Sequence, residues 1–185
     1  YVLVENVNAQ PNEPGGTLPN TQIEVSVLLD SISLVLPKYD HYYQAGDLGT
    51  VGVGTYTGDT DNYSCATWDG TEPVYNYATN PTCRKTLWYK FTSTITGNVR
   101  YRVFINGTVK YDYYDVQLFR DKRPGDSTST GLEVRGYTFY YDNSTNSYWA
   151  ETCVAPGTYY LLITGCGQLN QYVYPQIQLV ENVGD

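Results

Sequence analysis

The regular alternation of apolar and polar residues constrains the fold of this chain more than any other feature. In the segment 98–106, NVRYRVFIN, apolar side chains occupy every second position from Val99 to Ile105, and Arg100 and Arg102 stand between them. This period of two places alternate side chains on opposite faces of a β-strand. No stretch of 11 or more residues keeps apolar positions at helical spacing. The sequence therefore predicts an all-β chain.

Further strands are predicted where similar runs lie between turn residues. In 86–94, TLWYKFTST, Leu87 and Phe91 share one face and Trp88 takes the other, and Thr96-Gly97-Asn98 after it predicts a hairpin. Other predicted strands are 23–29, 32–36, 114–120, 132–141, 147–151, 158–164 and 172–180, whereas 37–80 is loop-rich. Many short strands at such spacing favour a two-sheet antiparallel β-sandwich of jelly-roll type.

The pentapeptide LVENV occurs twice, at 3–7 and at 179–183. A proline- and glycine-rich stretch follows the first copy at 8–20 and is typical of a linker. We interpret 1–7 as the tail strand of a preceding repeat and 21–185 as the β-sandwich module. The alternative is that 1–7 is an N-terminal strand of the same domain. A start at Tyr1 and the lack of methionine favour a segment of a longer protein.

Charge and hydropathy exclude two classes of partner. The formal net charge is -8 and the pI is about 4.5, which argues against nucleic-acid binding because phosphates need clustered Lys and Arg. No apolar run reaches the roughly 20 residues of a membrane-spanning helix, so no membrane insertion is expected.

Four cysteines form an even set without a C-x-x-C pair, which favours disulfides over a zinc site. Sequence alone allows three pairings for Cys65, Cys83, Cys153 and Cys166. We predict the local pairs, Cys65 with Cys83 and Cys153 with Cys166, each stabilising by about 3 kcal/mol. Such bonds would place the protein in an oxidising compartment, whereas four reduced thiols are the alternative.

Catalytic motifs are lacking in the sequence. The one histidine, His41, lies beside tyrosines and Asp40, but no G-x-S-x-G or H-E-x-x-H motif accompanies it. A packed or solvated histidine explains this pattern, so no enzyme activity is expected.

Calcium is the one cofactor for which the sequence offers candidate ligands. The loop GDTDNYSCATWDGTE supplies Asp59, Asp61 and Asp69, and calcium binds several oxygen ligands from one loop. The spacing is not that of an EF-hand. Acidic side chains kept in water are the alternative explanation.

Tyrosine is the outlier of the composition, with 21 residues against 4 phenylalanines and 3 tryptophans. Adjacent tyrosines cannot all be buried on one face of a strand, so some rings are expected at the surface. Tyr113, Tyr114, Tyr140 and Tyr141 are the candidates for stacking on sugar rings or anchoring a partner. Half-buried strand residues are the alternative.

Several short motifs together resemble a known family. They are Asn-x-x-Cys at 62–65, Cys83 followed by Trp-Tyr-Lys-Phe at 88–91, Asp-Val-x-Leu-Phe at 115–119 and Pro-Gly-Thr-Tyr-Tyr-Leu at 156–161. Across 61–180 the chain resembles the β-sandwich modules related to bacterial pre-peptidase C-terminal domains. Such modules recur in exported proteins of Bacteroidota, including giant SprB-type gliding adhesins.

The resemblance implies a non-catalytic repeat module of a large adhesin, extracellular and on the cell surface. Its partners would be neighbouring repeats of the same chain, and polysaccharides or surface glycans. The alternative is a carbohydrate-binding accessory module of a secreted enzyme. A small hydrolase built around His41 is a third hypothesis. Fold class alone does not decide among them.

Overall fold

The structure is a computed structural model that describes residues 36–68, 72, 85–106, 114–123, 131–137, 140–165 and 171–181. These residues all belong to the second of two compact units, Leu34–Asp185. The first copy of LVENV, the linker predicted at 8–20 and the strand predicted at 23–29 lie outside the described residues. Their assignment stays a prediction.

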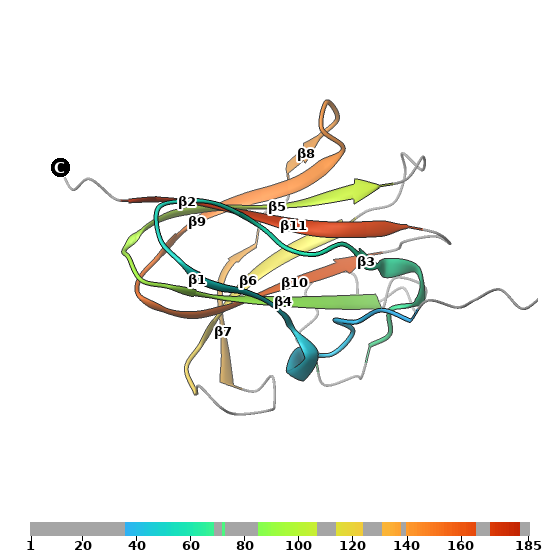
Figure 1. Ribbon diagram of the computed structural model, residues 1–185, viewed down its shortest axis with the longest axis horizontal. Coiled ribbons are helices and arrows are strands. Elements are labelled where there is room, and N and C mark those ends of the chain that lie inside the picture. Colours follow the sequence, from blue (N-terminus) through green and yellow to red (C-terminus); the bar gives the residue numbers. More distant parts are fainter. Residues whose placement is uncertain are drawn as a thin grey trace, which may run out of the picture. The chain divides into compact units, whose positions relative to one another are not determined.

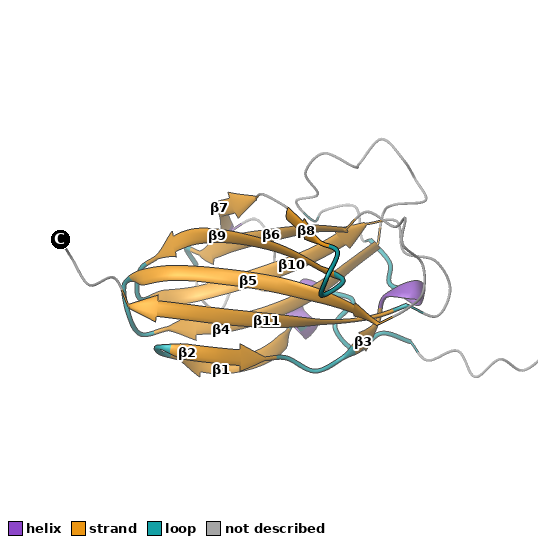
Figure 2. Cartoon of the chain, turned by 90° about the horizontal axis from the view of Figure 1, so that it is seen from above, coloured by secondary structure: helices purple, strands orange, loops and turns teal. Residues whose placement is uncertain are grey.

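Two β-sheets form the described part of the chain. The five-stranded sheet has the order β1 (Gly46–Val51), β4 (Lys85–Ser93), β10 (Gly157–Gly165), β6 (Tyr114–Asp121), β7 (Leu132–Tyr137). The second sheet has the order β2 (Gly54–Thr57), β11 (Tyr172–Glu181), β5 (Gly97–Asn106), β9 (Ser147–Val154), β8 (Tyr140–Asp142), and β3 (Asp61–Asn62) joins β11. Figure 1 shows the two sheets as packed layers, and Figure 2 shows β1 and β2 along one side of the sandwich. The predicted all-β sandwich is confirmed.

Within the described ranges, helical structure is limited to short 3-10 turns. They are η1 (Tyr42–Gln44) and η2 (Tyr63–Cys65). Among the described residues, no helix has the length and hydropathy needed to cross a membrane.

The core lies between the sheets and is built from the alternate residues that the sequence marks. Val99, Tyr101 and Val103 of β5 are fully buried, and so is Leu87 of β4. A hairpin between β4 and β5 was the expectation from Thr96-Gly97-Asn98, and it is wrong, because the two strands belong to opposite sheets. Crossing between sheets brings the two apolar faces together, whereas a hairpin would point them the same way.

Two further differences concern pairing and boundaries. The pair β1–β4 is parallel, with Gly46 opposite Tyr89, so the sandwich is not wholly antiparallel. The single strand predicted at 132–141 is two strands, β7 and β8, in opposite sheets. The region 37–80, expected to be loop, contributes β1, β2 and β3.

Aromatic side chains outside the main core cover the five-stranded sheet. Trp88 points away from Leu87, as predicted, yet it is fully buried. The ring of Tyr42 packs edge-on against it, with centroids 5.5 Å apart. Glu72 accepts hydrogen bonds from Trp88 Nε1 and from Thr86 Oγ1, both at 2.6 Å. This small second core fixes the position of Glu72 against β4.

Asp115 on β6 is a buried carboxyl group in the same sheet. It is 4% exposed and accepts a hydrogen bond from Gln117 Nε2 at 2.9 Å. Burial raises the pKa of Asp115, and the hydrogen bonds from Gln117 and the Val116 backbone lower it by less. Since the folded-state pKa lies above the unfolded value, the proton on Asp115 stabilises the fold below about pH 3.9. That contribution is lost as the pH rises through the folded-state pKa.

Asp115→Asn should therefore unfold at a higher denaturant concentration than the parent chain at pH 7, since asparagine carries no charge into the buried site. The difference should shrink as the pH falls through the raised folded-state pKa of Asp115 and should be smallest below about pH 4. Denaturant unfolding followed by tryptophan fluorescence between pH 3 and 7 measures both effects. Asp59→Asn, at an exposed position, is the control. A less stable Asp115→Asn chain at pH 7 would contradict the account.

Candidate functional site

Period-two alternation in the six-stranded sheet exposes a row of large side chains on its outer face. Tyr140 of β8 is paired with Trp149 of β9, and Trp149 is paired with Arg102 of β5. Arg100 lies two residues from Arg102 on the same face. We call Tyr140, Trp149, Arg100 and Arg102 the aromatic platform.

The rings and guanidinium groups of the aromatic platform are in direct contact. The centroids of Tyr140 and Trp149 are 4.8 Å apart and the rings are tilted by 32°. Arg100 Cζ lies 4.9 Å from the Trp149 ring and Arg102 Cζ lies 6.0 Å from it, within reach of cation–π attraction. Tyr140 is 55% exposed. The contacts hold the rings in place and leave Tyr140 exposed and Trp149 partly exposed to solvent.

One of the two arginines is paired with an acidic side chain and the other is not, among the described residues. Arg100 forms an ion pair and a hydrogen bond with Glu151, its neighbour across the β5–β9 ladder. Arg102 has no acidic partner among the residues that the structure describes. Its guanidinium donors are therefore available to an oxygen-rich ligand.

A shallow groove adjoins the platform on the same face. Asn98, Arg100, Glu151, Gln178 and Val180 line a cavity of about 270 Å³. Side-chain amides, a guanidinium and a carboxylate offer both donors and acceptors, which suits a ligand rich in hydroxyl groups.

The second LVENV copy borders this groove. Leu179 is buried in the core and Val180 is 52% exposed. The prediction that Val180 and its neighbours form the closing strand is confirmed, because β11 ends at Glu181.

The structure separates the four predicted ligand-binding tyrosines. Tyr114 is 1% exposed, with its ring 4.8 Å from that of Tyr63, so the prediction of a surface role for Tyr114 is wrong. Tyr141 is 40% exposed, but its ring leans on Tyr148, at the edge of the core. Tyr113 lies outside the described residues. Of the four, Tyr140 is the one that belongs to the aromatic platform.

The predicted calcium ligands do not form a site in the described residues. Asp61 is 4% exposed, and its two oxygens accept the backbone N–H groups of Lys38, Tyr39 and Asn62 at 2.8 to 2.9 Å. Its role is to fix 38–39 against β3, which corrects its assignment as a metal ligand. Within the described ranges, no three His, Cys, Asp or Glu side chains are grouped to hold a metal ion. Asp69 lies outside them.

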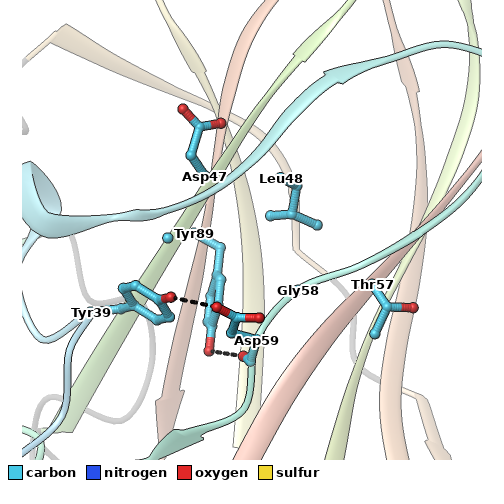
Figure 3. A pocket seen from close by; sticks show the side chains of 8 residues that line it. Tyr39, Asp47, Leu48, Thr57, Gly58, Asp59 and Tyr89 are labelled. Atoms are coloured by element: carbon cyan, nitrogen blue, oxygen red, sulfur yellow. Dashed lines mark hydrogen bonds between the residues drawn. The ribbon is translucent and has the colours of Figure 1, made fainter.

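Asp59 belongs to a small pocket between the edge strands β1 and β2 (Figure 3). Tyr39 donates its hydroxyl hydrogen to Asp59 Oδ2 at 3.1 Å, and Tyr89 donates to the Asp59 backbone oxygen at 3.0 Å. The cavity measures about 170 Å³ and is also lined by Asp47 and Thr57. Its width depends on Gly46, because a Cβ there would lie 2.9 Å from Tyr89 Cδ1.

The tyrosines of this pocket remain protonated. Burial raises the pKa of Tyr39, and the hydrogen bond and negative charge of Asp59 raise it further. Burial also raises the pKa of Tyr89. Neither phenol is activated as a base or nucleophile at neutral pH, so the pocket is suited to binding polar groups rather than to chemistry.

His41 contacts a tyrosine ring and lies near a carboxylate. Its ring stacks on Tyr43 with centroids 5.2 Å apart, and Nε2 lies 3.8 Å from Asp40 Oδ2. In the described part of the chain, the hydrogen bonds bring no serine or cysteine hydroxyl or thiol to His41. The described residues therefore place no nucleophile beside His41 for it to activate as a base.

Two of the four cysteines can be placed. Cys65 and Cys153 are free thiols in the structure, and Cys153 Sγ donates a hydrogen bond to Asn98 Oδ1 at 3.0 Å. Neither predicted disulfide is therefore formed in this structure. The predicted partners, Cys83 and Cys166, lie outside the described residues, so the pairing in the protein stays a prediction.

Comparisons with known proteins found a solved structure that resembles this chain at low sequence identity and a low TM-score. No protein-family model matches the sequence, and no curated protein matches it. Among solved structures, the chain is similar to the pre-peptidase C-terminal domain of a collagenase from Bacillus anthracis, at 14% sequence identity and a TM-score of 0.36. The match covers 74% of this chain and 96% of that chain.

Proposed function

We propose that this β-sandwich is a non-catalytic binding module of an exported protein, and that its aromatic platform holds an extended polysaccharide. The observation that carries the proposal is that Tyr140, Trp149 and Arg102 lie side by side, in contact, on the outer face of the six-stranded sheet. Aromatic rings present flat apolar surfaces to the C–H faces of sugars, and neighbouring donors bind their hydroxyl groups.

The shape of the surface favours a chain over a small molecule. Small-molecule sites are usually concave and enclose most of the ligand. Here the rings stand on an outer sheet face, and the groove beside them is shallow, with polar groups such as Asn98 and Gln178 along it. A polymer can lie across both features at once.

The wider setting that we propose is a repeated module of a surface adhesin. Its support is the duplicated LVENV, whose second copy begins in β11, and the motif resemblance across 61–180. Export to the cell surface is part of this proposal. Neighbouring copies would then present several aromatic platforms to one polysaccharide, and multivalency would strengthen weak single contacts.

Affinity gels that contain soluble neutral polysaccharides (hydroxyethyl cellulose, laminarin, galactomannan) test the proposal. We expect retardation of the parent chain in at least one gel and a loss of affinity of about tenfold or more in Trp149→Ala and Tyr140→Ala. Tyr43→Ala removes a ring that is 66% exposed on η1, which contacts β4 of the sheet opposite the platform, so it is the matched control. Equal retardation of all variants would contradict the proposal.

A further inference from the structure

We propose that a second, basic groove on the five-stranded sheet binds the sulfate or carboxylate groups of an acidic polysaccharide. The basic groove is defined by Arg120, Lys122, Arg135, Thr158 and Lys90. It lies on strands that carry no part of the aromatic platform, so the two proposals stand or fall separately.

The widest part of the basic groove is a cavity at the start of β10. Arg120 and Lys122, at the end of β6, line it together with Arg135 of β7 and Thr158. The cavity measures about 590 Å³ and is open to solvent. A space of this size admits a charged sugar unit.

A glycine with a positive φ lies beside the guanidinium of Arg120. Gly157 lines the cavity with a φ of +151°, and a Cβ there would lie 3.5 Å from Arg120 Nε. The Arg120 side chain is anchored by one hydrogen bond, from Nη2 to the Pro156 carbonyl at 3.3 Å. The remaining guanidinium donors are free to bind a planar or tetrahedral oxyanion.

The charges of the cavity leave a surplus of cations. Lys122 and Arg135 share a single carboxylate, that of Glu133, at 3.3 Å and 2.8 Å. Asp121 is 8% exposed and uses Oδ1 to accept the Arg123 backbone N–H at 2.8 Å. Three basic and two acidic residues thus line the cavity, which leaves one surplus positive charge in a protein whose net charge is -8. This contrast identifies an anionic ligand, which the rest of the surface would repel.

The groove continues across the sheet, which is why we infer a polymer. A second cavity of about 200 Å³ shares Asp121 and Thr158 with the first and extends to Lys90, Thr92 and Tyr160. Asp47 also lines it and forms an ion pair with Lys90 at 3.3 Å. The hydroxyls of Thr158 and Thr92 lie 3.4 Å apart across the β10–β4 pair. The hydroxyl groups and the tyrosine ring beside the cationic cavity match the neighbouring units of a sugar chain whose acidic group lies at Arg120.

Glu133 provides the sharpest test, because it competes with the ligand for Lys122 and Arg135. Dextran sulfate is the probe and neutral dextran of the same length is its control, with binding measured calorimetrically on the 185-residue chain at fixed ionic strength. Arg120→Gln should weaken binding about tenfold, and Glu133→Gln should tighten it several-fold. Lys38→Gln and Glu181→Gln change the net charge equally at exposed sites outside the groove and should change binding less than twofold.

Each alternative outcome overturns the proposal. If the control variants shift affinity as much as Arg120→Gln and Glu133→Gln do, net charge rather than the groove binds the polymer. If inorganic sulfate binds as tightly as dextran sulfate, the cavity is a site for a free ion. If Arg120→Gln retains its melting temperature and its full affinity, Arg120 does not contact the ligand.

Discussion

Glu72→Ala should lower the free energy of unfolding by about 3 kcal/mol. Glu72 is 5% exposed, and its carboxyl oxygens accept hydrogen bonds from Trp88 Nε1 and Thr86 Oγ1. Removing the acceptors leaves the indole N–H buried without this partner. Hydrogen bonds to a charged group are worth about 1.5–3 kcal/mol each, and an orphaned buried donor costs about as much. Urea unfolding followed by tryptophan fluorescence measures the change.

Two matched variants make this prediction specific. Glu72→Gln keeps one carbonyl acceptor for Trp88 and should cost about 1 kcal/mol. Glu181→Ala removes an exposed carboxylate at the end of β11 and should change stability by less than about 0.5 kcal/mol. Equal unfolding midpoints for Glu72→Ala and Glu181→Ala would show that Glu72 does not support β4.

Asp61→Ala should destabilise the chain by a similar amount, about 3 kcal/mol. Its carboxylate accepts the backbone N–H groups of Lys38, Tyr39 and Asn62, so alanine leaves three donors without that acceptor. Tyr39 in turn accepts the backbone N–H of Trp88 at 2.8 Å, which ties the same segment to β4. Loss of Asp61 therefore loosens the connection between both sheets.

Asp59→Ala is the control for this second prediction. It lies two positions earlier, its side chain is exposed, and its carboxylate accepts one hydrogen bond, from the Tyr39 hydroxyl. We expect a cost of less than about 1 kcal/mol. A melting temperature of the parent chain that rises with added calcium, and no longer does so in Asp61→Ala, would restore Asp61 as a metal ligand and contradict its structural role.

The strands with strong alternation could be predicted from sequence, because burial of one face requires that pattern. β5 shows this best, with Val99 to Ile105 buried at every second position. The edge strands could not be predicted from the sequence in this way. β1, Gly-Asp-Leu-Gly-Thr-Val, pairs through its backbone with β4, and an edge strand needs few apolar side chains to do so. The hairpin error at Thr96-Gly97-Asn98 has a similar cause, since turn residues do not say which sheet receives the next strand.

The candidate site was predictable only in part. An excess of tyrosine indicates exposed rings, and Tyr140 is one of them, but burial of Tyr114 depends on β6 lying between β10 and β7. Trp149 and Arg102 become neighbours through the β5–β9 register, which joins residues 47 positions apart. The alternation itself was the sequence signal for the arginines of the platform. It places Arg100 and Arg102 on the face of β5 that points away from the core. The basic groove likewise joins distant strands.

Amide chemical-shift mapping of the isotope-labelled chain tests the central claim most directly. The titrant is a short oligosaccharide of the polysaccharide that retards the chain most strongly in the affinity gels. The aromatic platform predicts that the Trp149 indole N–H and the backbone amides of Arg100, Arg102 and Tyr140 shift together with one saturation curve. Shifts confined to the pocket of Asp47 and Asp59, or no shift at the Trp149 indole at saturating oligosaccharide, would contradict it.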